Sequence, residues 1–270
     1  RRLSFEGPEI ELRESKNAQV AILLHSIAGL RLLEGGGVSP SIAAGHSVGE
    51  YSALVAARSL TIENALHLVR FRGELMSRAG GENPGTMAAV IGLSADDAEL
   101  VCQEASDAGV VQVANYNSPD QTVISGEVKA VERAVRIAEA KGAKRAVLLN
   151  VSGAFHSSLM KTAFLKFERV LSEAEIGDPE IPVVVNVTGG TVKDAEGIRE
   201  ALVRQIVSPV RWTDSMRKMT GLGFSAFVEV GPGKVLRGLL RRIDPEARVF
   251  SVEDRESLTQ VLGGLRAKGT

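Results

Sequence analysis

Residues 45–49 read G-H-S-V-G, a G-x-S-x-G pattern that stands between a short apolar run at 40–44 and a helical pattern at 50–57. This context predicts a serine on a sharp strand-to-helix turn, with its hydroxyl raised into solvent above a sheet and with glycines that let strand and helix pack closely. Ser47 is therefore a candidate nucleophile, and the amide of Val48 would face a tetrahedral oxyanion. The alternative is a glycine-rich turn that holds an incidental serine.

Helical and strand-like patterns alternate along most of the remaining chain. Further helices are predicted at 17–33, 61–78, 159–172, 198–206, 212–220 and 234–243, and further strands at 183–186 and 226–230. Such alternation implies an α/β fold with a mostly parallel sheet and helices on both of its faces.

One stretch in the middle of the chain departs from this alternation. It contains predicted strands at 87–93, 110–115, 121–125 and 145–151, predicted helices at 94–108 and 128–141, and a turn at 117–120. The order β-α-β-β-α-β is that of a ferredoxin-like unit. We therefore predict an α/β-hydrolase-like core formed by 1–82 and 151–270, with a ferredoxin-like subdomain inserted at 83–150.

The composition excludes several classes of protein. The 270 residues are 44% hydrophobic and 24% charged, as in an ordinary soluble protein, and no stretch is a convincing membrane span. A net charge of −1 gives no overall field for nucleic acid or an anionic membrane. The single cysteine, Cys102, can close no intrachain disulfide and build no thiolate metal site, which favours a cytoplasmic protein without a metal.

A nucleophilic serine needs a base, and the chain offers four histidines. His46 lies inside the turn and is better placed to touch substrate. His25 lies in an apolar helical pattern, which favours a core or supporting role, and His67 falls on a polar helix face. His156 follows a predicted strand in a loop, where α/β proteins assemble their sites, so it is the preferred base. A surface loop histidine is the alternative.

A third signal is an arginine on the apolar side of the predicted helix at 61–78. Arg72 falls near the centre of that side, where an isolated charge would be prohibitively costly. Either a protein carboxylate pairs with it, or the pocket binds an anionic ligand, for which the planar guanidinium offers two parallel hydrogen bonds. Together with Ser47 and His156, the second possibility indicates acyl transfer from a substrate that carries a free carboxylate.

Five motifs in order carry a resemblance to a known family. They are G-H-S-V-G-E-Y at 45–51, Arg72, N-Y-N-S-P at 115–119, G-A-F-H-S at 153–157 and V-E-V-G-P-G at 228–233. Over about 17–242 the chain resembles the malonyl-CoA:acyl carrier protein transacylases of bacterial type II fatty acid synthesis. The resemblance implies an α/β-hydrolase-like core with a ferredoxin-like insertion, in agreement with the pattern of elements.

The resemblance also implies a role for each matching residue. Ser47 matches the acylated serine, His156 its base, and Val48 an amide of the oxyanion hole. Gln205 matches the residue whose backbone carbonyl orients the histidine, and Arg72 matches the arginine that holds the malonyl carboxylate. The residues that match the lining of the acyl or thioester pocket are His46, Gln19, Asn115 and Asn117, and Phe155 belongs to an Ala-Phe pair that resembles the malonyl-selecting form in related polyketide acyltransferases.

The implied reaction is a ping-pong transfer of malonyl from malonyl-CoA, through a malonyl-serine, to the phosphopantetheine thiol of acyl carrier protein. It supplies the extender unit for fatty acid synthesis and needs no metal or redox cofactor. The family opens with a strand and a Gly-Gln-Gly-Ser-Gln turn that supplies a second oxyanion-hole amide. That segment is not among the 270 residues, and we expect the full-length protein to possess it.

Three other functions remain open at this stage. A trans-acting polyketide acyltransferase would use the same chemistry with a different carrier protein. An α/β-hydrolase esterase would place a carboxylate on His156. An inactive carrier-binding module would have no acylated serine.

Overall fold

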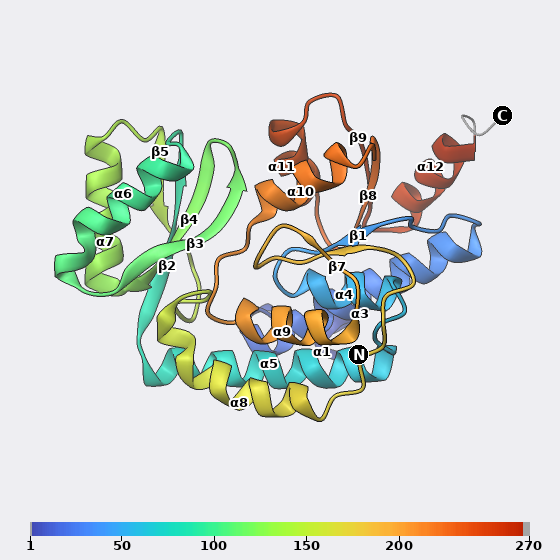
Figure 1. Ribbon diagram of the computed structural model, residues 1–270, viewed down its shortest axis with the longest axis horizontal. Coiled ribbons are helices and arrows are strands. Elements are labelled where there is room, and N and C mark those ends of the chain that lie inside the picture. Colours follow the sequence, from blue (N-terminus) through green and yellow to red (C-terminus); the bar gives the residue numbers. More distant parts are fainter. Residues whose placement is uncertain (1, 267–270) are drawn as a thin grey trace.

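The computed structural model describes residues 2–266, which form two lobes that differ in architecture (Figure 1). The larger lobe contains the turn at Ser47 and most of the helices. The smaller lobe, drawn in green at the left of Figure 1, contains an antiparallel sheet with two helices.

The helices of the larger lobe cover a core of aliphatic side chains. They are α1 (Arg2–Glu6), α2 (Glu9–Leu12), α3 (Ser15–Gly35), α4 (Gly49–Ala56), α5 (Ile62–Glu82), α8 (Lys161–Ser172), α9 (Ala195–Gln205), α10 (Trp212–Gly221), α11 (Val235–Ile243) and α12 (Arg255–Arg266), with a 3₁₀ turn η2 at Ser158–Met160. Local capping begins the long helix α5, because the Thr61 hydroxyl accepts a hydrogen bond of 3.1 Å from the Asn64 amide. Helices α3 and α8 pack along α5, which leaves Arg72 of α5 inside the core.

The strands of the larger lobe are short. They are β1 (Ala43–Ala44), β6 (Val183–Val184), β7 (Thr191–Val192), β8 (Ala226–Val230) and β9 (Arg248–Val252). Strand β1 pairs with β6 and β8 with β9 in parallel, whereas β7 is antiparallel to β6. The predicted parallel pairing is therefore present, but within residues 2–266 it is divided between two small sheets instead of one.

The smaller lobe has the predicted ferredoxin-like topology. Its elements are β2 (Gly85–Ile91), α6 (Ala95–Ala105), the 3₁₀ turn η1 (Ser106–Ala108), β3 (Val111–Ser118), β4 (Gln121–Glu127), α7 (Val128–Ala140) and β5 (Arg145–Leu148). The strand order β3-β4-β2-β5 is antiparallel throughout. The α/β class and the inserted unit are confirmed. The boundaries at 82/83 and 150/151 stay a prediction, and the outer ends of the predicted core, residues 1 and 267–270, lie outside the described residues.

Several predicted elements differ from the observed ones. Strand β3 runs to Ser118, so that only Pro119 and Asp120 turn the chain, because Ser118 still pairs with Gln121. Strand β5 ends at Leu148 instead of residue 151, and the chain then turns toward the larger lobe. The expectation of a core position for His25 is wrong, since its ring is exposed. No pattern had predicted α1, α2, β7, β9 or α12.

Two backbone contacts join the lobes next to the functional residues described below. The amide of Tyr116 on β3 donates to the carbonyl of Val210 at 2.9 Å, and the Val210 amide donates to the carbonyl of Ala114 at 2.9 Å. The Thr213 hydroxyl adds a bond of 3.1 Å to the Tyr116 carbonyl. Strand β3 is thereby tied to the segment that follows α9.

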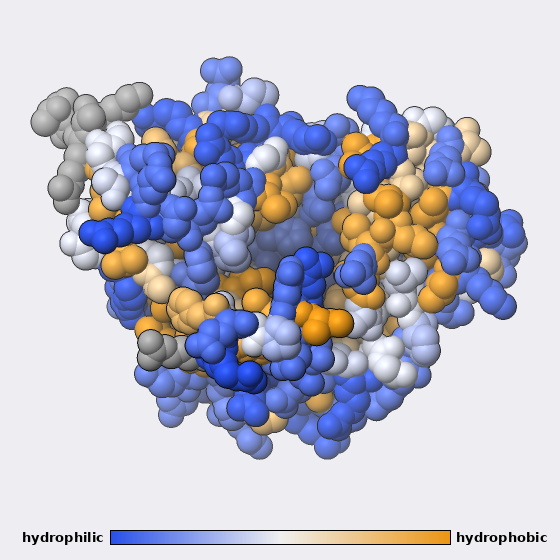
Figure 2. Space-filling model, turned by 180° about the vertical axis from the view of Figure 1, so that it is seen from behind, coloured by the Kyte–Doolittle hydropathy of each residue, from blue (hydrophilic) through white to orange (hydrophobic). Residues whose placement is uncertain are grey.

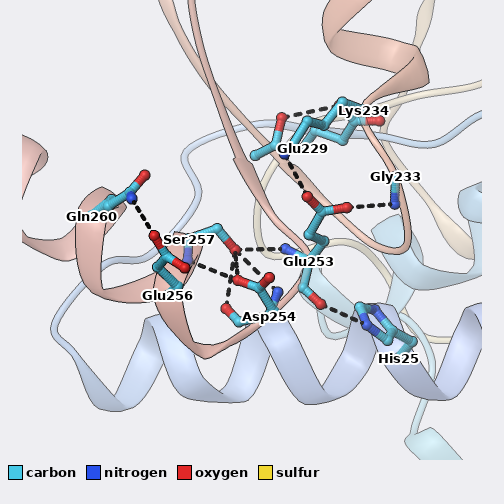
Figure 3. A network of polar contacts seen from close by, with 10 residues as sticks. His25, Glu229, Gly233, Lys234, Glu253, Asp254, Glu256, Ser257 and Gln260 are labelled. Atoms are coloured by element: carbon cyan, nitrogen blue, oxygen red, sulfur yellow. Dashed lines mark hydrogen bonds and ion pairs between the residues drawn. The ribbon is translucent and has the colours of Figure 1, made fainter.

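The motif at 228–233 has a structural role at the start of α11. The Glu229 carboxylate accepts hydrogen bonds of 2.9 Å from the amides of Leu236 and Arg237. Figure 3 shows the neighbouring network, in which Glu253 bonds the Gly233 amide at 3.2 Å and the Lys234 ammonium at 2.6 Å. The Glu229 carboxylate thereby satisfies two amides that the N-terminus of α11 leaves without partners.

Candidate active site

The turn at Ser47 is strained and tightly packed. Ser47 has a φ of 52°, in the left-handed region that residues other than glycine rarely occupy. A Cβ on Gly45 would lie 2.0 Å from the carbonyl carbon and oxygen of Gly49, so position 45 requires glycine. A Cβ on Gly49 would meet no atom within 4 Å. Of the two flanking glycines, only Gly45 therefore lies where a side chain would clash with its surroundings.

Ser47 and His156 come together although they are far apart in sequence. The Ser47 Oγ lies 2.8 Å from His156 Nε2, and His156 Nδ1 lies 2.9 Å from the backbone oxygen of Gln205. Because a carbonyl oxygen can only accept, Nδ1 carries the proton and Nε2 is free to accept the serine proton. Burial, followed by the charge of Arg72, lowers the pKa of His156 to about 3, which keeps the ring neutral.

Arg72 reaches the same hydroxyl from the core. Its side chain is 1% exposed, and Nη2 donates to Ser47 Oγ and to Gln205 Oε1, both at 2.9 Å. Nη1 donates to Gln19 Oε1, and the Tyr51 ring lies 5.9 Å from the guanidinium carbon. Among residues 2–266 no carboxylate forms an ion pair with Arg72, and Nε has no acceptor. The buried cation is held by neutral groups alone.

Of the remaining predicted residues, His46 and Asn117 contact each other beside Ser47, whereas within residues 2–266 Asn115 does not bond to the other predicted side chains. His46 lies beside Ser47, where its Nε2 is 2.8 Å from Asn117 Oδ1 and its ring centroid is 5.5 Å from that of Trp212. Asn115 lies on the same strand as Asn117 but bonds none of the other predicted side chains in the described part of the chain. Phe155, half-buried, directly precedes His156.

The amide of Val48 is a donor of the turn without an acceptor among residues 2–266. Val48 is the N-cap of α4. An unpaired amide at a helix start beside a nucleophile can receive negative charge that develops on a substrate oxygen.

One surface cavity lies apart from the predicted site residues. This cavity, of about 430 Å³, is lined by none of them; its walls include Arg58, Ser59 and Arg199. Figure 2 shows the face opposite to that of Figure 1, which is hollowed near its centre between apolar side chains. Across residues 2–266, no group of His, Cys, Asp and Glu side chains could hold a metal ion, and none of the helices combines the length and apolar character needed to cross a bilayer.

Comparison with known proteins identifies the family to which this geometry belongs. The family model for the acyl transferase domain matches residues 5–255. The chain belongs to the acyl transferase domain family. The resemblance noted in the sequence is confirmed, and the protein is an acyltransferase.

Named relatives of this acyl transferase are similar over nearly all of its length. The malonyl CoA-acyl carrier protein transacylase of Bacillus subtilis is 43% identical over 98% of this chain and 84% of its own. The solved acyl-carrier-protein S-malonyltransferase of Burkholderia pseudomallei is 44% identical, with a TM-score of 0.93 over 97% of this chain and 86% of its own. A malonyl-transacylase solved with its type II PKS acyl-carrier protein is 43% identical, with a TM-score of 0.94 over 97% of this chain and 85% of its own.

Two buried residues of this acyl transferase were missed by sequence reasoning. Asn186 follows β6; its Oδ1 accepts from the Ser47 amide at 2.7 Å, and its Nδ2 donates to the Gly45 carbonyl at 2.6 Å. Glu50, in the first turn of α4, is fully buried, and burial raises its pKa to about 7. The one available signal was a charged residue at the start of the otherwise apolar pattern at 50–57.

Proposed function

We propose that this acyl transferase moves a malonyl group from malonyl-CoA to the phosphopantetheine thiol of an acyl carrier protein, through an ester on Ser47. The observation that carries the proposal is the buried Arg72, which has no acidic partner within 2–266 and donates to the Ser47 hydroxyl at 2.9 Å. A cation in this place stabilises a carboxylate at the far end of an acyl group attached to Ser47. The names of the relatives support the same substrate.

In the first half of the reaction, His156 Nε2 takes the proton of Ser47 as Oγ attacks the thioester carbon. The Gln205 carbonyl holds the ring in the required tautomer and stabilises the imidazolium that forms. The amide of Val48 donates to the oxyanion of the tetrahedral intermediate. The intermediate collapses with loss of the CoA thiolate, which receives the proton from His156, and malonyl-Ser47 remains.

In the second half, the same groups act on the carrier-protein thiol. His156 removes the thiol proton as sulfur attacks the Ser47 ester, and it returns that proton to Ser47 Oγ as the ester bond breaks. The malonyl thioester of the carrier protein leaves. These steps need only proton transfer and hydrogen bonds, so we propose a reaction without a metal or redox cofactor, carried out in the cytoplasm as part of fatty acid synthesis.

Selection of the acyl group follows from Arg72. A malonyl carboxylate can take the Nε–H that has no acceptor and replace Gln19 or Ser47 at the other nitrogens. An acetyl group offers no acceptor and leaves the buried cation to neutral partners alone. Sites built to bond a polar group reject analogues that lack it by large factors. His46, Asn115, Asn117 and Phe155 are proposed to line the rest of the acyl and thioester pocket.

A polyketide carrier protein is the second candidate acceptor, because one similar structure is a complex with a type II PKS acyl-carrier protein. An esterase is disfavoured, because His156 Nδ1 faces the carbonyl of Gln205 and not a carboxylate.

The proposal is tested by intact-mass measurement of the full-length protein after incubation with malonyl-CoA or with acetyl-CoA. We expect a malonyl adduct on the wild type, far less acetyl adduct, and neither on Ser47→Ala. Transfer to a fatty acid or a polyketide carrier protein then distinguishes the two acceptors. Hydrolysis of the acyl group without any adduct, or equal labelling by both thioesters, would contradict the proposal.

A further inference from the structure

One residue, Gln205, contacts the three groups to which the reaction is assigned. The backbone oxygen of Gln205 accepts from His156, its Oε1 accepts from Arg72 at 2.9 Å, and its Nε2 donates to the Ser47 carbonyl at 3.1 Å. Gln205 is fully buried. The arrangement works only while the amide oxygen, and not the amide nitrogen, faces the guanidinium.

That orientation is not fixed by shape, because the two ends of a carboxamide are nearly the same size. If the amide rotated by 180°, its NH₂ group would face the N–H groups of Arg72, and two buried donors would oppose each other. The guanidinium would lose the acceptor that holds Nη2 beside Ser47. A hydrogen-bond acceptor must therefore face the NH₂ group of Gln205 to fix this orientation.

Two acceptors face that NH₂ group, the Ser47 carbonyl and the carboxyl group of Glu50. Glu50 Oε2 lies 3.0 Å from Gln205 Nε2 and accepts a second bond, of 2.8 Å, from the backbone amide of Asn186. Because Oε2 already accepts the Asn186 N–H, any proton on Glu50 lies on Oε1, so Oε2 is an acceptor in either protonation state and excludes the reversed amide. The Ser47 carbonyl, the other acceptor of Gln205 Nε2, is shared with the amide of Glu50 at 3.1 Å.

The carboxylate is itself held by the nucleophile turn. Asn186, whose backbone bonds Glu50 Oε2, also bonds both sides of the turn through its side chain. Among residues 2–266 Glu50 Oε1 has no hydrogen-bond partner, so the two bonds of Oε2 determine where the group lies. The polar chain therefore runs from the Ser47 turn through Asn186 and Glu50 to Gln205, and from there to Arg72.

We propose that Glu50 is a positioning residue for acyl selection, whose Oε2 orients the Gln205 amide and thereby keeps Arg72 aimed at the acyl group on Ser47. Glu50 makes no hydrogen bond to Ser47 Oγ, His156 or Arg72 in the described structure, so it acts through Gln205. This inference rests on the proposed malonyl transfer, and it adds a residue whose loss should weaken selectivity more than acylation itself.

The test compares Glu50→Met, Glu50→Gln and the wild type, with Glu229→Gln as the matched control. Methionine keeps the length of the side chain and removes the acceptor. Glutamine keeps an oxygen in the place of Oε2, which can accept from Asn186 and Gln205. Its NH₂ group then takes the place of Oε1. Glu229 is also a carboxylate that accepts backbone amides, but it lies at α11. The measured quantity is the ratio of kcat/KM for malonyl-CoA to that for acetyl-CoA, followed as Ser47 acylation by intact mass.

We expect the ratio to fall about tenfold in Glu50→Met, the effect of losing one hydrogen bond to a buried group. We expect it to stay within about threefold of the wild type in Glu50→Gln and to be unchanged in Glu229→Gln. If Glu50→Met does not fold, Glu50→Asp withdraws the acceptor by one methylene and should lower the ratio in the same direction.

The opposite results are equally clear. A purely structural role would lower both rate constants by the same factor in Glu50→Met and leave the ratio unchanged, which overturns the inference. A loss in Glu50→Gln as large as in Glu50→Met also overturns it, because the orienting oxygen is still present. Failure of the wild type to accept malonyl would overturn the proposed function instead.

Discussion

Replacing Glu50 by glutamine should change how the stability of the protein depends on pH. Burial raises the pKa of Glu50 from 4.5 to about 7, against the lowering effects of the Asn186 amide, Gln205 and Arg72. Between these two values the folded protein keeps a proton that the unfolded chain releases. The free energy of unfolding contributed by Glu50 is therefore fully present below pH 4.5 and is lost as the pH rises through 7.

The size of this loss follows from the two pKa values. Each pH unit between them corresponds to about 1.4 kcal/mol, so the contribution falls by about 3 kcal/mol across the window. Glutamine does not titrate, and Glu50→Gln should not show this fall. His156 acts in the opposite direction, because its lowered pKa makes folding less favourable as the pH falls below 6.5. Its contribution is present in both proteins and cancels in their difference.

The assay is urea denaturation of the wild type and Glu50→Gln at half-unit steps from pH 5 to pH 8, with Glu229→Gln as the control. The wild type should lose about 2–3 kcal/mol relative to Glu50→Gln over that range. Glu229→Gln should follow the wild type. A difference between the wild type and Glu50→Gln that does not vary with pH would refute the reasoning, since the folded and unfolded protein would then bind the same number of protons at Glu50 over this range.

Three further predictions concern the site and the turn. Arg72→Met should lower kcat/KM for malonyl-CoA about 10³-fold while changing that for acetyl-CoA much less, and equal losses would contradict the carboxylate-binding role. Because the pKa of His156 is lowered to about 3, kcat/KM of Glu50→Gln, which lacks the carboxyl group that titrates near 7, should show no acidic limb at the usual histidine value of 6.5, and a limb there would show that the ring titrates normally. Gly45→Ala should abolish Ser47 acylation and lower Tm by many degrees, whereas Gly49→Ala, which meets open space, should change the free energy of unfolding by less than about 1 kcal/mol.

The parts of the fold with strong local signals could be predicted from the sequence. The caps at Thr61 and Ser94 mark the starts of α5 and α6, since each hydroxyl accepts the amide three residues on. The apolar runs at 40–44 and 183–186 predicted strands where β1 and β6 lie, but each observed strand has only two residues, and β7, equally short, has too few residues for a hydrophobic period to identify. Their positions are decided by pairing across the fold.

The residues of the candidate site also differ in whether a local pattern could predict them. Ser47 belongs to a local turn pattern, and Arg72 to the apolar side of one helix, so each could be found from nearby residues. Gln205 entered only through the family resemblance. Glu50 and Asn186 act across 155 and 141 positions of sequence, on Gln205 and on Gly45, and no local pattern encodes such contacts.

The backbone bonds between β3 and Val210 bear on how the enzyme accommodates substrates of different size. Val210 lies five residues after Gln205, and the strand to which it bonds carries Asn115 and Asn117. The strand that carries two residues of the proposed acyl pocket is thus joined, through main-chain hydrogen bonds, to the segment that follows Gln205. A swinging motion of the ferredoxin-like unit would have to break these two bonds, so we expect adjustment to a longer acyl chain to come from side-chain rotations and not from movement of the lobe.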